Sequence, residues 1–215
     1  MLTTASMKIR SDFRNNRRLQ ALTVLYVAVW IWAAISPVDR FDWFLENLLV
    51  IAFIGIFAAT YRRFPFSDLS YMLITVFLCL HAVGAHYTYS EAPVGYWLQE
   101  AFDLGRNHYD RIVHFLFGLL LGYPLREVVF RHAGVSGLMG SCVTCAMVLA
   151  LSSGFEMVEW IVAELVDPEA AYAYLGTQGD IFDAQKDTGL ATIGVAICLA
   201  ITALIEKSAP VRHAG

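Results

Sequence analysis

Charged residues are scarce in this chain of 215 residues: Asp, Glu, Lys and Arg together make up 16% of it, against about 25% in a typical soluble domain. Proline and cysteine are also few, with 6 and 4 residues, which excludes a collagen-like chain and a disulfide-stapled scaffold. Basic residues number 15 against 19 acidic ones, and the sequence lacks the basic stripe of a nucleic-acid-binding protein. These absences exclude an ordinary soluble globule and disfavour a nucleic-acid partner.

Hydrophobic residues, in contrast, make up 58% of the chain and give it a mean hydropathy of +0.56. Six segments have about the 20 largely apolar residues that a membrane-spanning helix needs. We therefore expect an all-α fold, a polytopic membrane protein built as a six-helix transmembrane bundle. The segments are residues 19–36, 43–60, 69–89, 111–130, 138–165 and 181–205.

The positions of lysine and arginine predict how the chain crosses the membrane. Eleven of the 15 basic residues fall in the N-terminal tail, in the loops after the second and fourth segments and in the C-terminal tail. Such positive segments stay in the cytoplasm, so both termini are expected to be cytoplasmic. The first outer loop is expected to hold a short interfacial helix at 94–102. The predicted organisation is a tail at 1–18, a six-span membrane domain at 19–205 with outer loops at 90–109 and 166–180, and a tail at 206–215.

Ionisable side chains gather at one depth, near the outer ends of the last four segments. Asp110 and His114 are four residues apart, and Glu156 and Glu159 are three apart. Residues at these spacings share one face of a helix. Adjacent carboxylates inside a membrane segment repel each other, which is hard to explain by packing alone. The pattern predicts a polar site that several helices build together.

Three aspartates at the start of the sixth segment add to this site. Asp180, Asp183 and Asp187 are spaced to share one helix face, although Asp180 is equally well placed to cap the helix. An acidic side chain in a span costs about 2.5–3.5 kcal/mol at mid-membrane. Two nearby basic residues, Arg111 and Lys186, are too few to balance the carboxylates. This shortage of positive charge predicts a bound divalent metal ion.

The predicted metal site draws on histidine and carboxylate side chains. Zinc accepts both kinds of ligand, magnesium and manganese prefer oxygen, and iron fits a mixed set, so the identity of the metal stays open. His108 and Lys186 are candidate acid–base or phosphate-contacting groups. The predicted metal ligands are His86, Asp110, His114, Glu156, Glu159, Asp183 and Asp187. Polar residues expected around them are His81, Tyr87, Glu91, Asn107, Gln178 and Asp180.

The competing interpretation is a hydrogen-bonded polar network that only holds the helices together. Gly118 and Gly122 form a G-x-x-x-G spacing that permits close helix packing. Glu46 and Asn47, at the outer end of the second segment, are interpreted as solvated. The four cysteines, including the C-x-x-C of residues 142–145, are interpreted as buried, reduced thiols within spans.

Several runs of residues resemble the YjdF-like family of bacterial inner-membrane proteins of unknown function. This resemblance implies a multi-pass protein of the bacterial inner membrane. The runs are LHAVGAHYTYSE (80–91), GYWL (95–98), RNHYDRIVHFLFGLLL (106–121), EMVEW (156–160) and LGTQGDIFDAQKD (175–187).

A more distant resemblance is to VanZ-like membrane proteins, which are linked to glycopeptide tolerance at the cell surface. It rests on Asp-Arg-x-x-His-Phe at 110–115, on Glu156 and on the Asp-x-x-x-Asp step at 183–187. This chain departs from that pattern at Asp187, where VanZ-like proteins usually have Asn, and at Glu159, where Gln is common. The resemblance implies the membrane location and these motif residues but no settled reaction.

Three functions follow from these observations. The first is a metal-dependent hydrolase or transferase that acts on a membrane lipid or lipid-linked envelope substrate, because metal sites suit chemistry at phosphate esters. The second is a proton- or cation-coupled transporter, since membrane carboxylates and histidines also form ion pathways. That pathway would have to cross the bilayer, whereas the inner halves of the last four segments carry almost no ionisable groups. The third is a non-catalytic envelope protein.

Overall fold

A computed structural model describes residues 13–208, so residues 1–12 of the tail predicted at 1–18, and residues 209–215 of the tail predicted at 206–215, lie outside the described residues. Every regular element between 13 and 208 is helical, which confirms the all-α prediction. The elements are η1 (Phe13–Asn15), α1 (Arg17–Ala34), α2 (Arg40–Thr60), α3 (Asp68–His86), α4 (Pro93–Phe102), α5 (Tyr109–Arg131), α6 (Gly137–Leu165), α7 (Pro168–Leu175) and α8 (Asp183–Ser208).

Five of these helices are long and apolar enough to cross a membrane: α2, α3, α5, α6 and α8. Their hydropathy confirms a polytopic membrane protein. The remaining long helix, α1, has 18 residues and begins with Arg17 and Arg18, two charged residues that lower its mean hydropathy. The expected span at 19–36 therefore forms a helix but is not among the five.

Local sequence signals explain where several helices begin. The side chains of Asn16, Asp39, Ser67 and Asp167 accept hydrogen bonds from backbone N–H groups in the first turns of α1, α2, α3 and α7, as N-cap residues do. The short helix predicted at 94–102 is present as α4, and its place at the membrane interface stays a prediction. Helix α7 was not predicted and lies within the expected loop at 166–180. Asp180 is not a helix cap, because α8 begins three residues later.

The chain divides into two compact units. Unit 1 contains residues 13–110 and 158–181, and unit 2 contains residues 111–157 and 182–208. Unit 1 therefore holds α1 to α4, the last residues of α6, and α7. Unit 2 holds nearly all of α5, most of α6, and α8. The boundary in α5 follows Asp110, the second residue of that helix.

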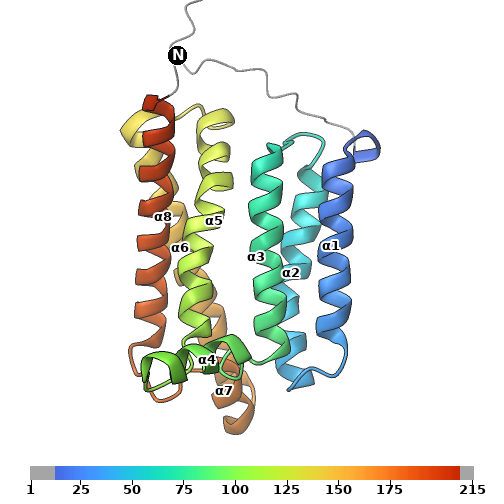
Figure 1. Cartoon of the computed structure of the whole chain (residues 1–215), viewed down its shortest axis with the longest axis vertical. Coiled ribbons are helices and arrows are strands. Elements are labelled where there is room, and N and C mark those ends of the chain that lie inside the picture. The colour runs from blue at the N-terminus through green and yellow to red at the C-terminus, as the bar shows by residue number, and fades with distance from the viewer. Residues whose placement is uncertain (1–12, 209–215) are drawn as a thin grey trace, which may run out of the picture. The chain divides into compact units, whose positions relative to one another are not determined.

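In unit 1, α1, α2 and α3 lie side by side, and α4 and α7 lie at one end of them (Figure 1). Helix α1 contacts α3 through His86, whose Nδ1 lies 3.0 Å from the carbonyl oxygen of Ala33 and whose ring stacks on Trp32. Helix α1 contacts α2 through the indole N–H of Trp30, which donates a 2.6 Å hydrogen bond to Oδ1 of Asn47. Polar side chains thus hold these helices together.

Helix α2 has its polar face inward. Its buried residues are Asp42, Glu46, Asn47 and Val50, while large apolar side chains along the rest of the helix are exposed. This is the reverse of a soluble helix and suits a lipid environment, where an apolar exterior costs nothing. The interpretation of Glu46 and Asn47 as solvated is therefore wrong: both are only 3% exposed.

In unit 2, α5 and α8 pack backbone against backbone. A Cβ atom on Gly118 of α5 would overlap the carbonyl oxygen of Ala191, and a Cβ on Gly194 of α8 would overlap that of Phe115. Gly122 comes close to Val195. The G-x-x-x-G spacing is thus used for close packing, as small residues allow in membranes. Beside this contact lies a core of Val148, Ala191 and Val195.

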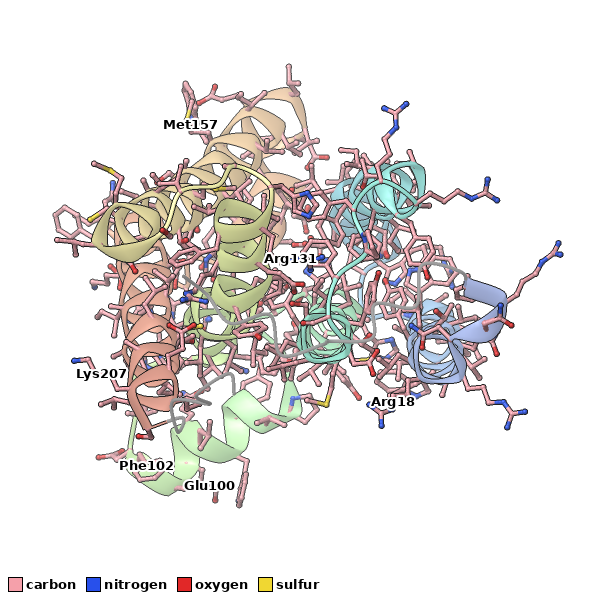
Figure 2. All side chains as sticks on the ribbon, turned by 90° about the horizontal axis from the view of Figure 1, so that it is seen from above. Arg18, Glu100, Phe102, Arg131, Met157 and Lys207 are labelled. Carbon is pink, nitrogen blue, oxygen red and sulfur yellow. The ribbon has the colours of Figure 1, made fainter. Side chains whose placement is uncertain are left out.

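The outer surfaces of the helices carry apolar side chains. Figure 2 shows Met157 of α6 and Phe102 of α4 directed away from the helices that carry them, and they are 57% and 69% exposed. Cys142 is also exposed on α6, so its interpretation as a buried thiol is wrong. Cys198 is buried, and all four cysteines are free, as expected.

Candidate metal centre

His114 occupies the centre of the polar group in unit 2. It lies one turn along α5 from Asp110 and is 8% exposed. Its Nε2 is 3.3 Å from Oε1 of Glu156, and its Nδ1 is 3.4 Å from the hydroxyl oxygen of Ser152. Ser152 and Glu156 are four residues apart on α6, so one face of that helix contacts both nitrogens of the ring. These two neighbours fix the orientation of the imidazole.

Asp183 and Asp187 lie in the first two turns of α8 and are buried, with exposed fractions of 6% and 1%. Their four-residue spacing puts both carboxylates on one face of the helix. Nη2 of Arg111 lies 3.2 Å from Oδ1 of Asp183. The buried acidic face of α8 is therefore in contact with the start of α5.

Asp110 completes an all-oxygen ligand set. Asp110 lies in the first turn of α5 and directly precedes Arg111, the residue that pairs with Asp183. Asp110, Asp183 and Asp187 each offer a carboxylate oxygen, and these three atoms all lie within 4.8 Å of one another. Three carboxylate oxygens at this spacing can surround one small, hard cation.

The charge balance of unit 2 favours a cation here. Asp183, Asp187 and Glu156 contribute three acidic groups, and Arg111 offsets one of them. Lys186 is exposed on α8, one residue before Asp187. Buried carboxylates at these distances repel each other unless they are protonated or meet a positive ion. The geometry therefore fits the metal ion that the sequence predicts.

Three of the predicted ligands belong to unit 1: His86, Glu159 and Asp110, which is the last residue before the boundary in α5. His86 packs α3 against α1 through Ala33 and Trp32, so its contacts give it a structural role. Glu159 follows Glu156 by one helical turn but lies beyond the unit boundary. The structure therefore brings Asp110, Asp183 and Asp187 together and pairs His114 with Glu156, whereas His86 packs α3 against α1.

The residues expected around the metal ligands mostly stabilise the loops of unit 1. The backbone N–H of Asn107 donates to Oε1 of Gln178, and Nε2 of Gln178 donates back to the carbonyl oxygen of Asn107, at 3.0 and 2.9 Å. Asp180 lies 4.0 Å from Nη1 of Arg106, which donates to the carbonyl oxygen of Thr177. These contacts join the loop before α5 to the loop before α8.

The other predicted residues lie elsewhere in unit 1. Tyr87 packs on His86 and Trp32. Glu91 is exposed and lines a cavity. His108, expected as an acid–base group, is half-buried directly before α5.

A second polar cluster in unit 1 was missed by the sequence analysis. Nδ1 of His81 is 2.5 Å from the hydroxyl oxygen of Tyr89, and its Nε2 is 3.9 Å from Oε2 of Glu46. Asp42, one turn before Glu46 on the same face of α2, is also buried. The four-residue spacing of Asp42 and Glu46 was a visible signal. It was overlooked because the predicted span began at residue 43, which placed Asp42 outside the membrane segment.

Comparisons with known proteins support the resemblance drawn from the sequence. A family model described as "predicted membrane protein (DUF2238)" matches residues 18–208. The chain is also similar to the inner membrane protein YjdF of Escherichia coli strain K12, with 38% identity over 175 residues, which are 81% of this chain and 82% of that protein. No solved structure matches it. Together with the five candidate spans, the relative confirms a multi-pass inner-membrane protein; the VanZ-like resemblance stays a prediction.

Proposed function

The chain belongs to the DUF2238 family of predicted membrane proteins, and on that premise we propose that it is a metal-dependent hydrolase or transferase acting on a membrane lipid or lipid-linked envelope substrate. One observation carries this proposal: the carboxylates of Asp110, Asp183 and Asp187 come within 4.8 Å of one another, and two of the three are buried. Burying carboxylates in a membrane protein costs considerable free energy. A functional role explains why such a group is retained better than helix packing does.

The ligand set narrows the identity of the metal. The proposed ligands are the three aspartates, because their carboxylate oxygens form the group that lies within 4.8 Å of one another, and His114 is not a member of that group. Oxygen-only ligands suit magnesium or manganese better than zinc, which favours nitrogen and sulfur. The proposed cofactor is therefore Mg²⁺ or Mn²⁺.

Each remaining residue has a proposed part in the chemistry. When bound, the metal ion supplies a Lewis acid for a phosphoryl or carbonyl oxygen and lowers the pKa of a bound water. His114, oriented by Glu156 and Ser152, is placed to accept a proton from an attacking hydroxyl group. Arg111 pairs with Asp183 and presents further N–H donors to an anionic head group. Lys186, exposed on α8, is a further proposed contact for a phosphate group.

The location of the site follows from the proposed topology. We propose six spans, with α1 crossing the membrane and both termini in the cytoplasm, because eleven of the 15 basic residues then fall on the cytoplasmic side. The start of α5 and of α8 would then face the periplasm, where lipid head groups and envelope precursors are accessible. Reporter fusions at the two termini test this orientation.

Metal analysis tests the function most directly. We expect protein purified in nanodiscs and dialysed against Mn²⁺ to retain about one equivalent by elemental analysis. Asp183→Asn removes a charged ligand and should weaken metal affinity by at least about 10–100-fold, which is the loss seen when only a residue that supports a metal ligand is replaced. Glu164→Gln, an exposed acid on α6, serves as the control and should bind metal like the unchanged chain.

A phosphatase assay on a phospholipid or polyprenyl phosphate in the same nanodiscs then tests the reaction. Metal-dependent phosphate release that is lost in His114→Gln, while the variant still binds metal, would support the proposed roles. Absence of bound metal under all conditions would refute the metal centre. Metal binding accompanied by ion or substrate flux in proteoliposomes, without turnover, would favour the transporter.

A further inference from the structure

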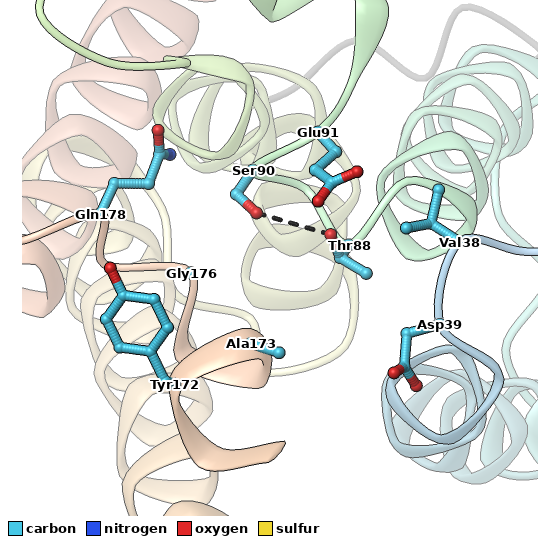
Figure 3. Close-up of a pocket in the computed structure, with 9 residues that line it drawn as sticks. All are labelled: Val38, Asp39, Thr88, Ser90, Glu91, Tyr172, Ala173, Gly176 and Gln178. Atoms are coloured by element: carbon cyan, nitrogen blue, oxygen red, sulfur yellow. Dashed lines mark hydrogen bonds between the residues drawn. The ribbon is translucent and has the colours of Figure 1, made fainter. Parts of the chain in front are cut away.

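A cavity of about 280 Å³ lies among three segments of unit 1 that are far apart in the sequence. Figure 3 shows α7 and the loop after it along one side, with the start of α2 and the turn after α3 along the other. Its volume is close to the lower end, about 300 Å³, of small-molecule sites in proteins. The cavity therefore has room for a small organic molecule, and none of the residues that line it is a proposed metal ligand.

Hydrogen bonds within unit 1 hold the walls of this cavity in place. Arg106 donates to the carbonyl oxygens of Gly176 and Thr177 at 3.3 and 2.9 Å, and the side chain of Gln178 bonds the backbone of the loop before α5. Thr88 and Gln178 have φ angles of 51° and 49°. This left-handed conformation costs free energy in residues other than glycine and is found most often at binding and catalytic sites. Walls fixed in this way lose little freedom when a ligand binds.

The polar side chains around the cavity include both acceptors and donors. Oδ1 of Asp39 accepts hydrogen bonds from two backbone N–H groups at the start of α2, which leaves Oδ2 for a ligand. Within residues 13–208, neither the carboxylate of Glu91 nor the hydroxyl of Tyr172 has a hydrogen-bonding partner. The hydroxyl oxygens of Thr88 and Ser90 lie 3.4 Å apart, so one hydroxyl bonds the other and the second is able to donate to a ligand.

This combination narrows the class of ligand. An anion is disfavoured, because the charged residues that line the cavity, Asp39 and Glu91, are both acidic. An ammonium group only donates hydrogen bonds, so it would leave the O–H donors of the cavity without an acceptor. A sugar ring suits both kinds of group, because each of its hydroxyls donates to a carboxylate and accepts from another O–H. Its apolar C–H face packs on an aromatic ring such as that of Tyr172.

We propose that this cavity binds one neutral sugar residue, supplied either by a glycolipid or by a free saccharide. Asp39 and Glu91 accept hydrogen bonds from the sugar hydroxyls. Thr88 or Ser90 donates one in return, and the ring of Tyr172 packs against the apolar face of the sugar. This site goes beyond the proposed metal-dependent reaction and does not depend on the metal centre.

Saccharide binding to the full chain tests the proposal. Glucose, galactose, mannose and N-acetylglucosamine are titrated one at a time into protein in phosphatidylcholine nanodiscs with EDTA, and binding is followed by saturation-transfer difference NMR. We expect saturable binding of at least one of them. Asp39→Asn and Glu91→Gln should each weaken it about tenfold or more, because each removes a charged acceptor. Asparagine still serves as the cap of α2, so Asp39→Asn should fold. Glu100→Gln, exposed on α4 (Figure 2), is the matched control and should bind normally.

The aromatic contact and the cavity itself have separate tests. Tyr172→Phe keeps the ring and should weaken binding less than about threefold, whereas Tyr172→Ala removes it and should weaken binding about tenfold. Tyr96→Ala, exposed on α4, is the matched control and should bind normally. Ala173→Phe, which places a large side chain in the cavity, should abolish binding.

A second arm distinguishes the two sources of the sugar. Nanodiscs that contain glucosyl diacylglycerol should raise the unfolding temperature of the unchanged chain, but not of Glu91→Gln, if a glycolipid supplies the sugar; binding of soluble saccharides alone identifies a free sugar. The proposal is overturned if neither binds, if Asp39→Asn and Glu91→Gln bind like the unchanged chain, or if ethanolamine binds in place of the sugars. Sugar binding that requires Mg²⁺ or Mn²⁺ would also overturn it and would assign the sugar to the metal centre. Should Asp39→Asn fail to fold, Glu91→Gln and Ala173→Phe decide the question.

Discussion

The substitution Asp187→Asn distinguishes a metal site from a structural network. Without metal, it should stabilise the protein if Asp187 is a metal ligand and destabilise it if Asp187 only holds the helices together. The substitution keeps the size and shape of the side chain and removes one negative charge. Because Asp187 is 1% exposed, the variant leaves no new cavity and gains little from contact with water. Any change in stability should therefore come from charge and hydrogen bonding.

The magnitude follows from the distances between the carboxylates. Two unit charges 4.8 Å apart repel by about 3.5 kcal/mol at an effective dielectric constant of about 20. Asp187 takes part in two such pairs, with Asp110 and Asp183, while Arg111 offsets part of the repulsion at Asp183. Without metal, the variant should thus be more stable by about 3 kcal/mol or more. At a metal concentration a hundred times the dissociation constant, the unchanged chain gains about 2.7 kcal/mol, and the variant loses most of this gain.

The assay is thermal unfolding in nanodiscs, followed by tryptophan fluorescence at a fixed scan rate, with EDTA and with Mg²⁺ or Mn²⁺. A change of 3 kcal/mol corresponds to a shift of about 6–12 °C for a chain of this size. Glu164→Gln, exposed on α6, provides the control for loss of a surface charge. If Asp187→Asn destabilises the protein equally with and without metal, the carboxylate is a hydrogen-bonding member of the bundle and the metal centre is refuted.

Two further predictions concern packing and pH. Gly194→Ala should destabilise the protein by about 1–3 kcal/mol, since the new Cβ would overlap the carbonyl oxygen of Phe115, while Gly189→Ala on the same helix has open space and should be neutral or slightly stabilising; equal unfolding temperatures would contradict the close α5–α8 contact. Burial raises the pKa of Tyr174, so the folded state holds the neutral phenol and loses stability as pH rises past the unfolded value of about 10. In absorbance titrations at alkaline pH, Tyr174→Phe should leave the native signal unchanged and remove one phenol from the signal of the unfolded protein; a loss from the native signal would show that Tyr174 is accessible.

Much of the fold could be predicted because a membrane simplifies the problem. Long apolar runs must become helices, since the bilayer core offers no water to satisfy backbone polar groups. The helix bounds therefore follow closely from the hydropathy of segments such as residues 138–165, which became α6. Helix α7 was missed because its eight residues are too short to leave such a pattern, although Pro168 and the cap Asp167 were visible signals.

The candidate site could be predicted only in part. Helical spacing places Asp183 with Asp187, and Asp110 with His114, because neighbours at these intervals share a face whatever the tertiary fold. The same rule pairs Glu156 with Glu159 on α6 but says nothing of which neighbouring helix each contacts. Figure 1 and the contacts of His86 show α3 packed against α1. The periodicity of the sequence does not reveal which helices pack against each other.

The amino-acid sequence by itself determined the class of protein, through its few charges and long apolar segments. It also identified the carboxylates whose place within those segments costs free energy. Only the tertiary structure decided which of these carboxylates meet. Asp110, Asp183 and Asp187 are drawn within 4.8 Å, because glycines at 118 and 194 let the backbones of α5 and α8 approach. The structure also turned the polar face of α2 inward, burying Asp42 and Glu46. Distance and burial set the strength of an electrostatic interaction, and both depend on which helices pack together.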